Sequence, residues 1–203
     1  MNASSTLIVP EKGISTRRQM LGTLGVATLS ASAMAILAGC ESSMARSKAA
    51  KAADPANDVA TLNVALGLEQ EGIAAYQLGA ESGLLQKPVL ATAVMFQSQH
   101  KEHASALEAT IKKLGGTPVQ PKSMDEYAKA LNAASLKNQT DVLRLAQKLE
   151  LGATNAYLGV IPTFSNPDLA KVSGQIAADE VMHWTVLTSA LGDHLPAQAF
   201  NFG

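Results

Sequence analysis

The stretch Glu180-Val181-Met182-His183 places a carboxylate and an imidazole three residues apart inside a segment with helical periodicity. On an α-helix, side chains at this spacing lie on one face and can reach a common point. Ile176 and Leu187 continue the same face on either side, which predicts that the face is turned toward a hydrophobic core. Because ionisable groups are costly to bury alone, the stretch indicates a polar site within a helical protein.

The same pattern occurs in three other segments, so the sequence predicts four long helices. They span about residues 58–82, 88–116, 139–161 and 167–192. A carboxylate or an imidazole interrupts the apolar stripe of each helix near its midpoint. The interrupting residues, helix by helix, are Glu69; His100 and His103; Glu150; and Glu180 with His183. Since helix midpoints lie level whichever way the helices run, we expect these groups to meet in one layer of an all-α four-helix bundle.

The connecting segments predict the topology of this bundle. Residues 83–87 and 162–166 are short joins, which require antiparallel neighbours. The middle join, residues 116–138, is long, and its stretch Ser123-Met124-Asp125-Glu126 is a capping box that predicts a short helix to about residue 134. A join of this length can run along a whole helix. We therefore expect two antiparallel hairpins joined by a long crossover, with the second and third helices parallel.

No lysine or arginine lies on the four stripes, so their carboxylates lack a counter-charge within the bundle. A divalent metal ion is the natural counter-charge, and neutral imidazoles are further ligands for it. The pattern is also repeated, because Glu69 with Tyr76 recurs as Glu150 with Tyr157. Two similar hairpins facing each other predict a pseudo-symmetric metal site. The alternative is a hydrogen-bonded polar layer that holds no metal.

Over about residues 58–192 the chain resembles the ferritin-like superfamily, specifically small exported ferritin-like domain proteins. The metal site of that superfamily takes one Glu from each of two helices and a Glu-x-x-His pair from each of the other two. Glu69 and Glu150 match the single glutamates, and the stretch that begins at Glu180 matches one pair. The resemblance implies iron or manganese bound by mixed Glu and His ligands.

The second Glu-x-x-His pair is matched only at His103, because His100 stands where a glutamate is expected. One bridging carboxylate is thereby lost, which leaves one ion or two unequal ions as alternatives to the standard two-ion centre. His100 is expected either to bind metal or to hydrogen-bond a ligand. The number of histidines would also suit zinc or copper.

Tyr76 and Tyr157 lie seven residues after Glu69 and Glu150. The resemblance suggests that these tyrosines hydrogen-bond the ligand carboxylates across the core. The alternative is that they are ordinary core tyrosines. Two polar residues near the predicted site receive no role: we expect Gln99 to point away from it and Asp179 to lie on a solvated face.

The N-terminal part of the chain reads as an export signal. Arg17 and Arg18 precede an uncharged stretch, as in a twin-arginine signal, and Leu37-Ala38-Gly39-Cys40 resembles a bacterial lipobox in which Cys40 carries the lipid. The alternative is an uncleaved signal anchor. We expect an exported protein, tethered to a membrane on the periplasmic side of the cell envelope through Cys40. The predicted divisions are a signal peptide, residues 1–39; a flexible tether, residues 40–56; and a ferritin-like domain, residues 57–203.

The composition of the chain excludes further classes of function. The net charge of −1 gives no case for nucleic-acid binding, and a single cysteine excludes an internal disulfide. The leading hypothesis is a redox metalloprotein that reacts with dioxygen or peroxide, a small oxidant substrate. The alternatives are a protein that binds metal without turnover and a metal-free structural or stress-protective envelope protein. The oligomeric state is left open.

Overall fold

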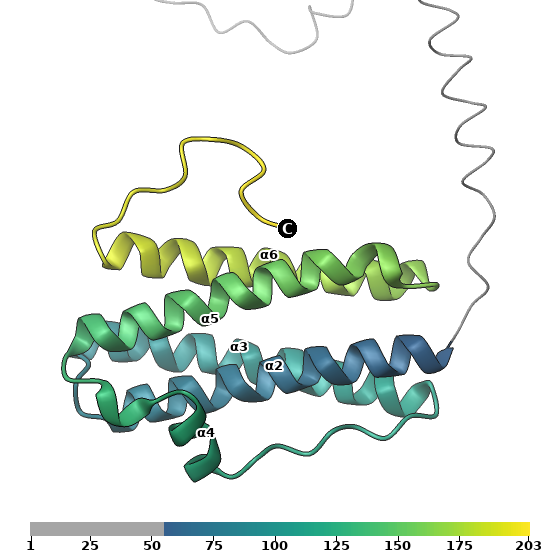
Figure 1. The fold of residues 1–203 in the computed structure, drawn as a ribbon, viewed down its shortest axis with the longest axis horizontal. Coiled ribbons are helices and arrows are strands. Elements are labelled where there is room, and N and C mark those ends of the chain that lie inside the picture. The colour runs from purple at the N-terminus through teal and green to yellow at the C-terminus, as the bar shows by residue number, and fades with distance from the viewer. Residues whose placement is uncertain (1–54) are drawn as a thin grey trace, which may run out of the picture. The chain divides into compact units, whose positions relative to one another are not determined.

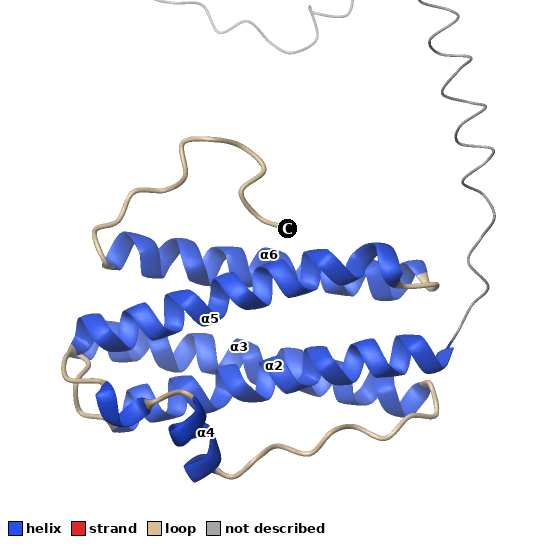
Figure 2. Cartoon of the chain, in the orientation of Figure 1, coloured by secondary structure: helices blue, strands red, loops and turns tan. Residues whose placement is uncertain are grey.

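The structure is a computed structural model that describes residues 55–203. Arg17, Arg18 and Cys40, the predicted export and lipidation residues, lie outside this range. Within residues 55–203 the chain forms five α-helices and two short 3₁₀ turns and has no strand (Figure 2). The elements are α2, Pro55–Glu81; α3, Lys87–Lys113; α4, Met124–Ala130; η2, Ala133–Ser135; α5, Gln139–Val160; η3, Ile161–Thr163; and α6, Pro167–Ala190. None of these helices combines the length and the apolar character needed to span a bilayer.

The four long helices form two antiparallel hairpins, α2–α3 and α5–α6, as the short joins predicted (Figure 1). The long crossover carries the chain from the end of α3 back along the bundle, so that α3 and α5 run in the same direction. The side chains of Asn63 and Gln70 hold this crossover against α2 by hydrogen bonds to the backbone of Thr117 and Val119. The predicted all-α four-helix bundle, with two hairpins joined by a long crossover, is therefore confirmed.

The helix ends follow from local sequence. Gly83 and Gly192 end the first and last long helices with φ values of 71° and 72°, a left-handed conformation that glycine adopts without steric cost. The capping box of the crossover forms, because Ser123 accepts from the Glu126 backbone while the Glu126 side chain accepts from Ser123. The helix after it is shorter than predicted. Asn132 takes a left-handed conformation that breaks it, and the 3₁₀ turn η2 follows.

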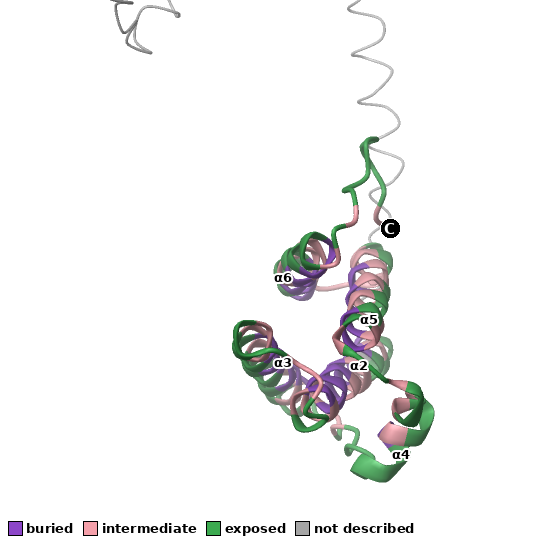
Figure 3. Ribbon diagram, turned by 90° about the vertical axis from the view of Figure 1, so that its left-hand side faces the viewer, coloured by how far each residue is buried: buried purple, intermediate pink, exposed green. Residues whose placement is uncertain are grey.

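Two apolar clusters fill the bundle, one toward each end. One contains Leu66 and Ile111, and the other contains Phe96, Leu143 and Leu187. An end view shows that the buried residues lie on the helix faces turned to one another (Figure 3). Along each long helix the predicted polar residues lie between members of the two clusters. The bundle therefore has an apolar core divided by one polar layer.

Candidate metal centre

The structure brings all six predicted ligand residues together at the middle of the bundle. Three of the four long helices supply at least one carboxylate each, and α3 supplies two imidazoles. The residues are Glu69 from α2, His100 and His103 from α3, Glu150 from α5, and Glu180 and His183 from α6. Five of the six are at most 3% exposed, and only His103 is partly exposed. Three carboxylates and three imidazoles thus share one volume shielded from water.

The first candidate set of ligands consists of Glu69, His100, His103 and Glu180, whose ligand atoms lie within 4.8 Å of one another. His103 Nδ1 is 3.5 Å from Glu69 Oε2 and 3.3 Å from Glu180 Oε1. His100 Nδ1 approaches the same two carboxylates, at 2.8 Å and 3.7 Å. Two carboxylates and two imidazoles are a donor set that iron, manganese and zinc all accept.

The second candidate set consists of His100, Glu150, Glu180 and His183 and meets the same distance limit. His183 Nδ1 is 3.5 Å from Glu150 Oε2 and 3.3 Å from Glu180 Oε2. His100 Nε2 is 3.2 Å from Glu150 Oε1. The two sets therefore share Glu180, through one oxygen each, and His100, whose two ring nitrogens face opposite sets.

Several buried polar atoms of this cluster have no hydrogen-bond partner, although buried polar atoms in proteins almost always have one. They are His103 Nδ1, Glu150 Oε2, Glu180 Oε1, Glu180 Oε2 and His183 Nδ1. These are the atoms that the short distances above bring together. The donor set thus fits metal, since ions bound to the two candidate sets would satisfy these atoms.

Close helix packing admits the His100 ring. A Cβ atom on Gly72 of α2 would lie 3.2 Å from His100 Cε1 and Nδ1, so any larger residue there would push the ring. The ring lies between Glu69 and Glu150 and contacts both. An imidazole therefore occupies the place where the superfamily pattern has a second shared carboxylate.

Each predicted tyrosine donates a hydrogen bond across the bundle to the glutamate of the other hairpin. Tyr76 donates to Glu150 Oε1, and Tyr157 donates to Glu69 Oε1. Both hydroxyls are buried, and the crossed arrangement repeats the pseudo-symmetry of the sequence. Each tyrosine leaves the other oxygen of its carboxylate available to the centre.

The pKa values show how strongly the site attracts positive charge. Burial by itself would lower the pKa of His100, but hydrogen bonds to Glu150 and Glu69 outweigh it and raise the pKa to about 11. The pKa of His103 rises to about 10, because Glu180 and Glu69 outweigh the effect of burial in the same way. Burial raises the pKa of Glu180. Without a metal, protons bound to the histidines supply the positive charge that balances the carboxylates.

Two residues that the sequence analysis set aside contact the outer nitrogens of the imidazoles. Gln99 Oε1 lies 2.7 Å from His183 Nε2, so the expectation that Gln99 points away was wrong. Asp179 is partly exposed, yet its Oδ2 lies 3.2 Å from His103 Nε2. Such partners fix which ring nitrogen faces inward. The spacing in the sequence did not indicate these contacts. Gln99 and Asp179 each lie one residue before a predicted ligand, and adjacent residues of a helix point to different faces.

The fold and the central cluster define a class of protein: a four-helix bundle with glutamate and histidine side chains gathered at its middle. The model of the ferritin-like domain family matches residues 57–193. The chain belongs to this family.

Solved structures agree with this assignment at the level of the fold. One is a conserved hypothetical protein from Mycobacterium tuberculosis, with 19% identity and a TM-score of 0.61; the match covers 72% of this chain and 99% of that one. Another is a ferritin-like, diiron-carboxylate protein from Bacillus anthracis str. Ames, with 21% identity and a TM-score of 0.54; the match covers 68% of this chain and 97% of that one. No curated protein matches the chain.

Proposed function

We propose that this protein is a redox metalloprotein that holds one or two iron or manganese ions at the bundle centre. The observation that carries the proposal is the set of buried atoms without a hydrogen-bond partner on His103, Glu150, Glu180 and His183. Burying three carboxylates beside no lysine or arginine would be costly without a cation. The likeness to a diiron-carboxylate protein of the same fold adds support.

The residues have distinct parts in this proposal. Glu180 would be shared between two ion positions, while Glu69 with His103 and Glu150 with His183 would serve one position each. Tyr76 and Tyr157 hold the outer oxygens of their carboxylates, so that the inner oxygens stay oriented. A bound iron or manganese ion would supply electron transfer with dioxygen or peroxide.

The surroundings of the cluster suit such chemistry. The Phe96 ring stacks on His183 with centroids 4.1 Å apart and keeps water from that side. Gln99 and Asp179 orient two of the imidazoles from outside. A pre-oriented donor set lowers the cost of reorganising ligands during a redox cycle.

A second candidate function is metal binding without turnover, with zinc or copper as further candidates for the ion. It is favoured by His100, which replaces a charged ligand by a neutral one and makes the two candidate sets richer in nitrogen donors. A metal-free structural or stress-protective role is the remaining alternative.

We also propose that the protein acts outside the cytoplasm, anchored to a membrane of the cell envelope by a lipid on Cys40. The paired Arg17 and Arg18 and the lipobox support this location. Cys40→Ser is expected to release the protein from the membrane fraction. Replacing both arginines by lysine is expected to keep it in the cytoplasm. Unchanged fractionation of both variants would contradict the proposed anchor.

Metal analysis tests the central proposal. The protein is purified without chelators and also reconstituted, and its metal is measured by mass spectrometry beside Glu150→Ala, His183→Ala and the exposed control Glu102→Ala. We expect about one to two iron or manganese ions per chain in the parent and the control. The two site variants should hold clearly less metal, because each removes a ligand of the second set. A change in ultraviolet absorption on adding peroxide would separate redox chemistry from binding alone. No metal under either condition would contradict both.

A further inference from the structure

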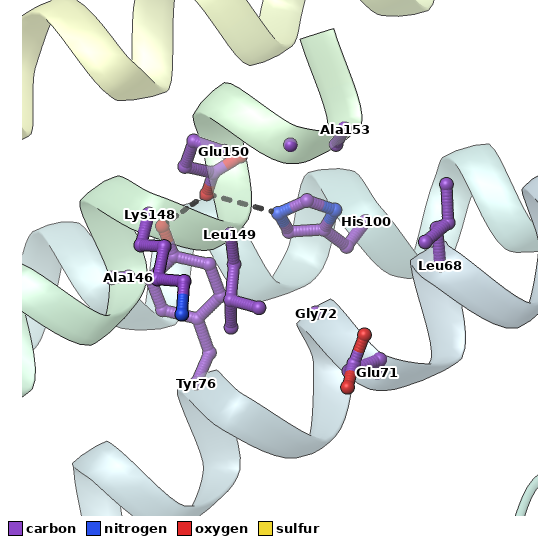
Figure 4. Close-up of a pocket in the computed structure, with 11 residues that line it drawn as sticks. Leu68, Glu71, Gly72, Tyr76, His100, Ala146, Lys148, Leu149, Glu150 and Ala153 are labelled. Carbon is purple, nitrogen blue, oxygen red and sulfur yellow. Dashed lines mark hydrogen bonds and ion pairs between the residues drawn. The ribbon is translucent and has the colours of Figure 1, made fainter. Parts of the chain in front are cut away.

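A cavity of about 270 Å³ lies between α2 and α5 and reaches the polar cluster from the side (Figure 4). Its walls are mainly apolar and include Leu68 and Gly72 from α2 and Leu149 and Gly152 from α5. Its inner end is formed by His100, Glu150 and Tyr76, joined by the hydrogen bonds drawn in Figure 4. The cavity therefore leads from the α2–α5 side of the bundle to His100 and Glu150 of the candidate metal centre.

The size and the walls of the cavity select the kind of molecule that fits. An apolar cavity of roughly 150 Å³ is enough for benzene, and pockets for drug-sized ligands begin at about 300 Å³. The space of about 270 Å³ thus suits one ring with small substituents. Gly152 is exposed at the outer part, and an added Cβ there would meet no atom within 4 Å. The absence of side chains at Gly72 and Gly152 keeps this space open on both helices.

The polar groups of the cavity indicate the charge and the hydrogen-bonding groups of a molecule that would bind there. Lys148 and Glu71 both line it, so their charges offset each other and the lining does not favour a charged molecule. At the inner end the Tyr76 hydroxyl donates a hydrogen bond to Glu150, and its oxygen keeps a lone pair that can accept another. A ligand hydroxyl that reaches this end could therefore donate a hydrogen bond to the Tyr76 oxygen.

We propose that this cavity binds a small neutral aromatic alcohol, of the phenol class, with its ring between α2 and α5 and its hydroxyl toward Tyr76. Describing this molecule as a second substrate of the metal centre rests on the proposed function. The binding itself does not, because every group invoked belongs to the protein.

The test compares two identical substitutions on one helix. Gly152→Leu fills the cavity, whereas Gly159→Leu adds the same side chain to another exposed glycine of α5 that has open space around it and does not line the cavity. Leucine favours the helix equally at both sites. The full-length protein in its metal-free form is titrated with phenol, toluene and benzoate. Binding is followed by ligand-detected NMR, and circular dichroism checks that each variant is folded.

We expect phenol to bind the parent and Gly159→Leu, toluene to bind more weakly and benzoate to bind least. Gly152→Leu should weaken phenol binding at least about tenfold, as expected when apolar contacts are replaced by a clash. Absence of phenol binding to the parent, equal binding to both variants, or a preference for benzoate would overturn the proposal. Metal analysis of the same preparations, taken before the metal is removed and again after reconstitution, keeps the two hypotheses apart. Metal without phenol binding defeats only this inference, and phenol binding without metal defeats only the proposed function.

Discussion

The two hairpins present the same scaffold with different side chains. The α5–α6 hairpin supplies Glu150 and the complete pair Glu180 and His183, whereas the α2–α3 hairpin supplies Glu69 and a pair in which His100 replaces the glutamate. The bundle thus accommodates an imidazole in one hairpin where the other has a carboxylate, and the crossed tyrosine bonds form in both halves. The substituted ring fits because Gly72 leaves space beside it.

The largest effect is expected from Glu180, the carboxylate that both candidate ligand sets share. Glu180→Ala should abolish metal binding altogether, since each of its oxygens approaches the imidazole of a different set. His103→Ala and His183→Ala should each remove one set and spare part of the other. Metal per chain, measured after reconstitution, checks this order. Equal residual metal in all three variants would contradict a shared carboxylate.

A smaller change would make the two hairpins alike. His100→Glu restores the Glu-x-x-His pair on α3, and we expect it to raise the metal content toward two equivalent ions, about the content of the complete pattern. The physical reason is the added negative charge facing both sets. His100→Gln, which adds no charge, is the matched control and should not gain metal. Calorimetric titration with Mn²⁺ or Fe²⁺ under exclusion of air measures the stoichiometry. An unchanged stoichiometry in His100→Glu would refute this explanation of the asymmetry.

The stability of the metal-free protein should depend on pH through the α3 histidines. The folded pKa of His100 is raised from 6.5 to about 11, so its contribution is complete below pH 6.5 and is lost as the pH rises toward 11. The free energy of unfolding should therefore fall between pH 6.5 and pH 11, by at most about 1.4 kcal/mol per pH unit for each such group. The melting temperature should fall with it. His100→Gln should show a shallower fall, and the exposed His194→Gln should follow the parent. Parallel curves for all three proteins would argue against this charge pairing.

The smallest expected effect separates the two tyrosines. Tyr157→Phe leaves a buried oxygen of Glu69 without its donor and should lower the free energy of unfolding by about 2 kcal/mol. Tyr76→Phe should cost less, about 1 kcal/mol, because Tyr76 and Glu150 line the α2–α5 cavity and water there can replace the lost bond. Chemical denaturation of the metal-free variants measures both. A larger loss for Tyr76→Phe would show that water does not substitute there.

Much of the fold was accessible from local patterns. The apolar stripes, Gly83, Gly192 and the Ser123–Glu126 capping box identify where helices run and stop, because these signals act within a few residues. The end of the short crossover helix was not predictable in the same way. Asn132 adopts a left-handed conformation, which asparagine takes more readily than most residues but not at every position, so its identity alone did not locate the end of the helix.

The candidate site also has a part that local sequence patterns predict and a part that they do not. The six residues at the helix midpoints could be selected from spacing, because a buried ionisable group stands out against an apolar stripe. The contacts of Gln99 and Asp179 with the imidazoles could not, since their spacing turns them off the stripe and each contacts a histidine on the opposite hairpin. Nor does any spacing rule indicate that Gly72 faces His100.

The sequence by itself determined the helical class, the two hairpins and the choice of residues in the polar layer, because helical periodicity and turn chemistry are local properties. Only the tertiary structure decided which carboxylate faces which imidazole, that each tyrosine crosses to the other hairpin, and that a cavity opens between α2 and α5. Those features depend on the distances between helices. Such distances are set by the packing of side chains that lie far apart in the chain.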